Sequence, residues 1–151
     1  MISFFRNFKK LRSYCQDESI QLSWSLMGDN FASRFGGKYI IYVSPYQSLS
    51  LIISTILHEI GHTMTWKGES VESREKLRFV RARINYVPRP SDQKDTYTLE
   101  EASVIIDDET SAWVNGLLIA QKLGVKVPKN YKDQWKKSVR SYQDYFNKNK
   151  V

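Results

Sequence analysis

Two hydrophobic patterns divide the chain into a short β region near the N-terminus and a longer helical part. From Ile20 to Leu26 every second residue is hydrophobic, which is typical of a half-buried strand. Residues 31–35 and 38–43 are shorter strand candidates, separated by the turn residues Gly36 and Gly37. Because the connections are short, the three strands are expected to form a small antiparallel meander.

Helical spacing of hydrophobic residues predicts five helices in the rest of the chain. They are expected over residues 1–14, about 45–66, 71–85, 99–123 and 130–151. The first helix is amphipathic and is expected to pack on the domain, with binding to a membrane surface as the alternative. Ser44 is expected to cap the second helix, and Thr98 with Glu101 forms a capping box for the fourth. Residues 87–97 contain two prolines and are expected to be a loop.

Length and composition favour a single domain. The 151 residues are 41% hydrophobic, which is enough for one core, and no internal repeat is present. The predicted fold class is α+β, a zincin-like arrangement in which a small sheet precedes the long helices. The longest hydrophobic run, residues 49–57, is too short to cross a bilayer. With the single cysteine Cys15 and no signal-peptide pattern, a soluble cytoplasmic protein is expected.

The net charge of +7 favours acidic partners. Such a charge attracts nucleic acid or an acidic protein surface over a long range. A solvated, lysine-rich surface accounts for the same charge, and no nucleic-acid-binding motif accompanies it. Nucleic acid is therefore kept as an alternative partner that no motif indicates.

The strongest chemical signal is the sequence His58-Glu59-Ile60-Gly61-His62, which has the form H-E-x-x-H and uses both histidines of the chain. Residues four apart on a helix lie on one face, about 5–6 Å apart at Cβ. His58 and His62 are therefore spaced to bind one zinc ion, and Glu59 to act as general base on a metal-activated water. Gly61 costs about 1 kcal/mol relative to alanine inside a helix, and room beside His62 is its expected reason.

A catalytic zinc needs a third protein ligand, for which Glu109 is the candidate. Glu109 lies within the hydrophobic stripe of helix 99–123, and a buried carboxylate is costly unless a cation meets it. Zinc would be that cation. The alternative is an ion pair with Arg78, Arg81 or Arg83.

Two further acidic residues precede this glutamate. Asp108 shares a helical face with Glu101 and is expected to be exposed to solvent. Asp107 and Asp108 are alternatively spaced to accept a hydrogen bond from a zinc-bound imidazole.

With these motifs the chain resembles gluzincin-type zinc metallopeptidases. The matching residues are 58–62 and, on the later helix, Glu109-Thr110-Ser111-Ala112-Trp113. The order of sheet, H-E-x-x-H helix and glutamate helix is also similar to small ImmA/IrrE-type metallopeptidases. The resemblance implies that His58, His62 and Glu109 bind Zn²⁺ and that Glu59 is the base. Relatives of this type often cleave a repressor-type partner, so the expected substrate is a protein or peptide, with regulatory proteins among the candidates.

The expected activity is zinc-dependent hydrolysis of a peptide bond. Strand 38–43 is expected at the sheet edge, where it would bind an extended substrate by β-addition. Tyr86, Tyr97 and Tyr131 are candidates for stabilising the oxyanion, with packing or surface positions as the alternative. Cys15 is a candidate zinc cap or simply a buried residue.

Two other interpretations remain open at the level of sequence. One is a non-catalytic, basic zincin scaffold that binds a protein or nucleic acid. The other is a structural zinc, which three ligands disfavour because structural sites normally have four.

Overall fold

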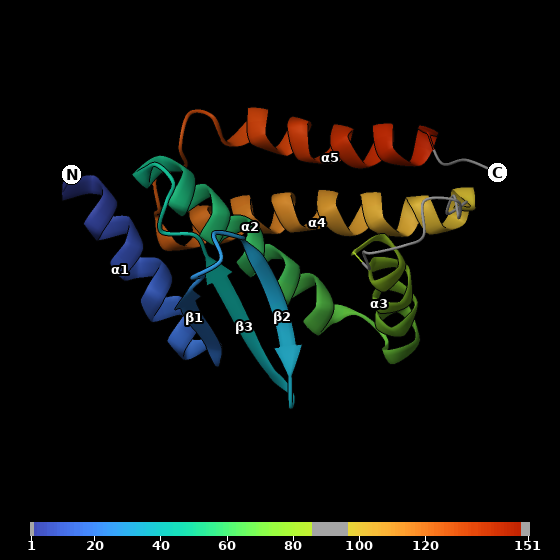
Figure 1. Ribbon diagram of the computed structural model, residues 1–151. Helices are drawn as coiled ribbons and strands as arrows, with labels where there is room; N and C mark the ends of the chain where they lie inside the picture. Colours follow the sequence, from blue (N-terminus) through green and yellow to red (C-terminus); the bar gives the residue numbers. More distant parts are fainter. Residues whose placement is uncertain (1, 86–96, 149–151) are drawn as a thin grey trace.

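The computed structural model describes residues 2–85 and 97–148 (Figure 1). Its elements are α1 (Ile2–Asp17), β1 (Ile20–Trp24), β2 (Phe31–Phe35), β3 (Lys38–Val43), α2 (Leu49–Gly68), α3 (Val71–Asn85), α4 (Leu99–Leu123) and α5 (Tyr131–Lys148). The predicted α+β class is confirmed: the described residues form one three-stranded sheet and five helices. None of these helices is long and apolar enough to cross a membrane.

The sheet has the order β1-β3-β2, and the predicted antiparallel meander is wrong. β1 pairs with β3 in parallel, whereas β2 pairs with β3 antiparallel. β3 is therefore the central strand, and its predicted place at the sheet edge is also wrong. The physical reason is burial, because Ile41 and Val43 are fully buried, whereas β2 is largely exposed. A tight turn at Gly36 and Gly37, both with positive φ, joins β2 to β3.

Helices α2 and α4 pack against each other with their backbones in close contact. A Cβ atom placed on Gly61 would lie 1.9 Å from the carbonyl oxygen of Ala112. One on Gly116 would lie 2.7 Å from the carbonyl oxygen of Leu57. Gly61 therefore allows two helices to approach, which corrects the expectation that it makes room beside His62. This crossing brings the H-E-x-x-H face of α2 against the middle of α4.

The helix ends confirm one predicted cap and correct another. The hydroxyl of Thr98 accepts from the amide of Glu101, whose carboxylate accepts from the amide of Thr98, as the capping box requires. α2 begins at Leu49 and is capped by Ser48, not by Ser44. Ser44 instead donates its amide to the side chain of Asn30, which keeps it in the turn that follows β3.

The remaining helices cover this centre from the outside. α1 contributes Leu11, Tyr14 and Cys15 to the main core, which confirms that α1 packs on the domain. Burial raises the pKa of Cys15 to about 12, so this thiol is a neutral core residue. α5 runs alongside α4 (Figure 1). Most of the expected loop at residues 87–97 and the last residues of the expected C-terminal helix, 149–151, lie outside the described part.

Candidate metal centre

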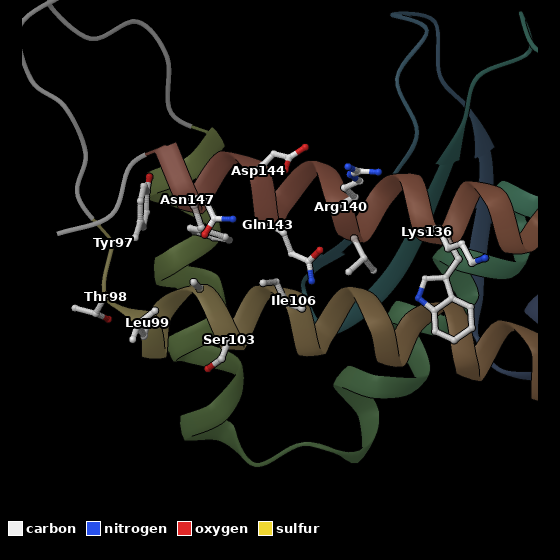
Figure 2. A pocket seen from close by; sticks show the side chains of 14 residues that line it. Tyr97, Thr98, Leu99, Ser103, Ile106, Lys136, Arg140, Gln143, Asp144 and Asn147 are labelled. Atoms are coloured by element: carbon white, nitrogen blue, oxygen red, sulfur yellow. The ribbon is translucent and has the colours of Figure 1, made fainter.

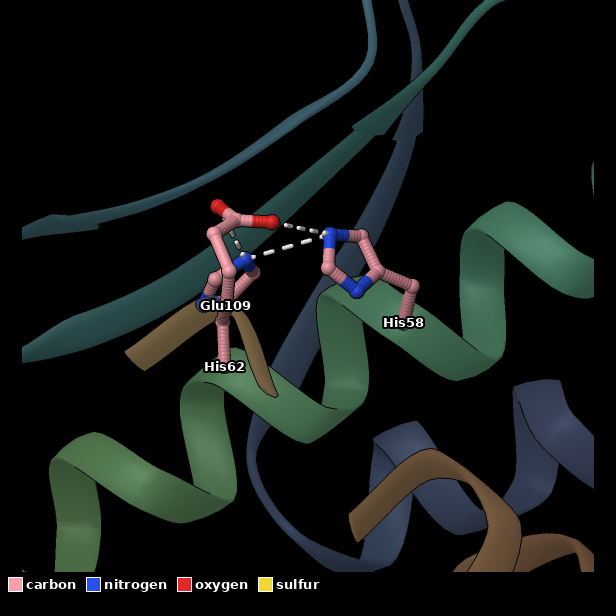
Figure 3. Close-up of side chains that lie close together, drawn as sticks. All are labelled: His58, His62 and Glu109. Atoms are coloured by element: carbon pink, nitrogen blue, oxygen red, sulfur yellow. Dashed lines mark hydrogen bonds and ion pairs between the residues drawn. The ribbon is translucent and has the colours of Figure 1, made fainter. Parts of the chain in front are cut away.

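The two histidines and the glutamate predicted from the sequence come together between α2 and α4. Figure 3 shows the Glu109 carboxylate directed at both imidazole rings. The Nε2 atoms of His58 and His62 are 3.2 Å apart. Each lies 3.4 Å from one carboxylate oxygen of Glu109, His58 from Oε2 and His62 from Oε1. Among the described residues these three form the group that could hold a metal ion.

The three distances fit a tetrahedral zinc site. Ligand atoms about 2.0–2.1 Å from zinc are separated by roughly 3.3–3.4 Å along each edge of a tetrahedron. The Nε2 atoms are 3.2 Å apart and each lies 3.4 Å from a carboxylate oxygen, which is close to that edge length, but the two histidines face different oxygens of Glu109. Two imidazole nitrogens and one carboxylate are a donor set also found in catalytic zinc sites, which keep a fourth position for water.

The two imidazole rings are oriented by aromatic neighbours. The ring of His58 stacks on that of Trp113, with centroids 4.2 Å apart and an interplanar angle of 23°. Trp113 lies one turn beyond Glu109 on α4, so one helix both supplies the carboxylate and supports a histidine. The ring of His62 lies 5.5 Å from that of Trp66. Stacking, not a hydrogen bond at Nδ1, orients His58, because its Nδ1 has no partner.

Asp108 is buried beside His62, which corrects the expectation that it is exposed to solvent. It is 4% exposed, and its Oδ2 lies 3.1 Å from His62 Nδ1. This is an ion-pair distance, although the imidazole N–H is not aligned for a hydrogen bond. The other oxygen, Oδ1, accepts a hydrogen bond from the indole of Trp66 at 3.1 Å. Asp107 is exposed, so only Asp108 takes the supporting position that the sequence left open.

Arg81 on α3 closes the site from the other side. Its Nη2 lies 2.9 Å from Glu109 Oε1 and also contacts Asp108 Oδ2. The arginine that the sequence offered as an alternative partner of Glu109 is therefore present together with the two histidines. The side chain of Arg83 lies outside the described residues. Glu109 forms the ion pair with Arg81 and also directs one carboxylate oxygen at each imidazole, so both sets of contacts are present together.

Burial and charge set the protonation of this cluster. Burial disfavours the charged form of His62, but the carboxylates of Asp108 and Glu109 outweigh it and raise its pKa to about 9. Burial also disfavours the carboxylate of Glu109, yet hydrogen bonds from His58 and His62 hold its pKa well below the ordinary value. Glu109 is therefore ionised and suited to bind a cation.

Glu59, the predicted base, is buried next to His58 and is 6% exposed. Burial raises the pKa of Tyr142 on α5, and the charges of Glu109 and Glu59 raise it further. Arg81, which pairs with Glu109, lowers this pKa through its charge and a hydrogen bond. α5 also supplies Ser138, whose hydroxyl donates to Glu109 Oε2 at 3.2 Å.

Of the tyrosines named from the sequence, the two in the described part of the chain, Tyr97 and Tyr131, make other contacts. Tyr131 donates its hydroxyl to the carbonyl of Trp113 at 3.0 Å, and Tyr97 packs against Phe146 in the second hydrophobic cluster. Tyr86 lies outside the described residues. The signal that could have found Tyr142 is the helical spacing of α5, which places Ser138 and Tyr142 one turn apart on one face.

One surface groove lies along α4, and another is bordered by β2, α2 and α3. The larger one, about 700 Å³, lies between α4 and α5 and includes Tyr97 and Lys136 but no member of the triad (Figure 2). The smaller one, about 580 Å³, includes Trp66 and Arg81, which contact Asp108 and Glu109. The smaller groove also contains no member of the triad, but it adjoins the candidate metal centre through Trp66 and Arg81.

Comparison of the chain with protein-family models, curated proteins and solved structures found no match. The class defined by fold and site is thus an α+β protein with a His-His-Glu group able to hold a metal ion.

Proposed function

We propose that this protein is a zinc metallopeptidase of the gluzincin type, which hydrolyses a peptide bond of a protein substrate. The observation that carries the proposal is the triad itself. His58, His62 and Glu109, from two helices, bring one possible ligand atom each to within 4.8 Å of one another, and a buried glutamate directly follows the first histidine.

The charge of the cluster also favours a divalent cation. The buried carboxylates of Glu59, Asp108 and Glu109 stand against the guanidinium of Arg81. Without a metal, the raised pKa of His62 keeps its imidazole protonated, so three negative charges stand against two positive charges; when His62 loses its proton to bind a metal, two negative charges remain. An uncompensated buried charge costs several kcal/mol. A bound Zn²⁺ would balance the two charges, which supports a metal over a purely structural role for the histidines.

When bound at such a site, zinc lowers the pKa of water towards 7 and polarises a carbonyl group. Glu59 would accept the proton of the attacking water and return it to the leaving amine. Tyr142 of α5, whose pKa is shifted by the charges of Glu109, Arg81 and Glu59, is the candidate donor to the developing oxyanion. Asp108 acts through His62, and Trp113 through His58, so both are positioning residues.

A second function is favoured by one specific observation. Arg81 pairs with both Asp108 and Glu109, so it neutralises part of the cluster without any metal. This arrangement suits a non-catalytic, basic scaffold that binds a protein or nucleic acid. Such a scaffold would show no hydrolysis with zinc added.

Zinc-dependent cleavage of a peptide library tests the proposed function. We expect the zinc-loaded protein to cleave a subset of peptides, chelation to stop cleavage, and added zinc to restore it, because the ligand set requires the metal. Product masses read by mass spectrometry give the cleavage sites. Cleavage that persists at full rate after chelation, or no cleavage of any peptide by the zinc-loaded protein, would contradict the proposal.

A further inference from the structure

The groove connected to the metal centre is bordered by a strand edge on one side and by arginines on the other. Its walls are β2, the end of α2 at Trp66, and one face of α3. Arg74, Arg78 and Arg81 follow each other at helical spacing on that face, and Arg34 of β2 lies opposite. Four cationic side chains therefore line a groove of about 580 Å³.

Three of these arginines have no carboxylate partner within ion-pair distance in the described part of the chain. Arg34 lies over the ring of Tyr39, and Arg74 donates to the carbonyl of Trp66. Arg78 is exposed, and Arg81 alone forms ion pairs. Glu75 is the acidic residue among the groove-lining residues. Arg34, Arg74 and Arg78 outnumber the carboxylates of Glu75 and of Glu69, which interacts with Arg74, so the groove keeps a net positive charge.

The strand wall of this groove has an unpaired edge. β2 pairs with β3 on one side only, and among the described residues it forms no other backbone hydrogen bonds. Amide and carbonyl groups on a free strand edge bind an extended peptide as an additional strand. Alternate side chains of such a peptide point to the same face, so one set would meet the arginines of α3.

The groove reaches the proposed catalytic residues through two shared side chains. Trp66 and Arg81 line the groove, and they contact Asp108 and Glu109 at the metal centre. A peptide held along β2 would therefore lie beside the two side chains that contact Asp108 and Glu109.

We propose that this groove binds an extended, acidic segment of a protein, which adds to the edge of β2 and places its carboxylates on Arg34, Arg74 and Arg78. That the segment is also the cleaved substrate rests on the proposed function. The edge of β2 favours a peptide over nucleic acid, because its backbone groups match a peptide backbone and have no counterpart in a phosphate chain. Glu75 in the wall also opposes a continuous run of phosphates.

Binding of short labelled peptides tests the proposal independently of hydrolysis. The probes are two fluorescein-labelled octapeptides, one alternating valine and glutamate and one alternating valine and glutamine. They are titrated with the zinc-loaded Glu59→Gln variant, and binding is read as fluorescence anisotropy. We expect the glutamate peptide to bind at least about tenfold more tightly than the glutamine peptide at low salt. N-methylation of alternate peptide amides is expected to abolish binding, because it removes the strand pairing.

Matched arginine variants assign the preference to the groove. Replacing Arg34 and Arg78 together by glutamine is expected to remove the preference for the acidic peptide. Replacing the exposed Arg6 and Arg12 of α1 by glutamine changes the net charge equally and is expected to leave the preference intact. Equal binding of both peptides, an equal loss in both double variants, or tighter binding of a single-stranded oligonucleotide would overturn the proposal.

The outcome is separable from that of the proposed function. An acidic peptide that binds with the expected preference but is not cleaved by the zinc-loaded wild type would support the groove and contradict the peptidase. Cleavage of neutral and acidic peptides at equal rates would support the peptidase and contradict the groove.

Discussion

Replacing Glu59 by glutamine is expected to reduce peptide hydrolysis about 10²–10⁴-fold while zinc stays bound. Glutamine keeps the shape of the side chain, but it cannot accept a proton from water. Glu59 is not one of the three residues that could hold the metal, so the affinity for zinc should change little. Initial rates on a cleaved peptide and zinc content by mass spectrometry of the same samples measure both effects.

The matched control for this substitution is Glu72→Gln, since Glu72 is exposed on the first turn of α3. It removes the same charge away from the metal centre and should leave the rate unchanged. Full activity of the Glu59→Gln variant would remove Glu59 from the mechanism.

Replacing Gly61 by alanine is expected to destabilise the fold by about 3 kcal/mol or more. The new methyl group would lie 1.9 Å from the carbonyl oxygen of Ala112, which belongs to the backbone of α4 and cannot rotate away. The two helices would have to separate, and Glu109 would move away from His58 and His62. Unfolding in urea measures the loss of stability, and zinc titration measures the accompanying loss of affinity.

Gly68→Ala is the control for Gly61, because it lies at the end of the same helix with no atom within 4 Å of the added Cβ. Its stability should stay within about 0.5 kcal/mol of the wild type. If the Gly61→Ala variant were as stable as the Gly68→Ala variant, the close contact between α2 and α4 would be wrong.

The triad could be predicted from the sequence because its signals are local. His58 and His62 are placed by helical spacing alone, and Glu109 by its position in a hydrophobic stripe. The capping box at Thr98 is equally local and was predicted correctly.

The surroundings of the triad could not be predicted, because they depend on helices that are distant in sequence. Asp108 lies on a polar face of α4, and it is buried because Trp66 of α2 and Arg81 of α3 both contact it. Tyr142 reaches the site only because α5 packs along α4. The spacing within each helix is visible in the sequence, but the angle at which helices meet is not.

The strands of the sheet could also be predicted from the sequence, but their order could not. The three strand segments were predicted within two residues, since alternation and turn residues are local signals. Their order was predicted wrongly because short connections favour neighbours in sequence, whereas the most hydrophobic strand, β3, takes the centre.

Metal content tests the central claim most directly. Mass spectrometry measures the zinc content of three purified proteins after loading with zinc and desalting: the wild type, Glu109→Ala and Asp107→Ala. Asp107→Ala is the control, because Asp107 is an exposed carboxylate two residues before Glu109. We expect about one zinc per chain in wild type and Asp107→Ala, and much less in Glu109→Ala, because a two-histidine site binds zinc weakly without its third ligand. No zinc in the wild type, or equal zinc in all three proteins, would contradict the His58-His62-Glu109 site.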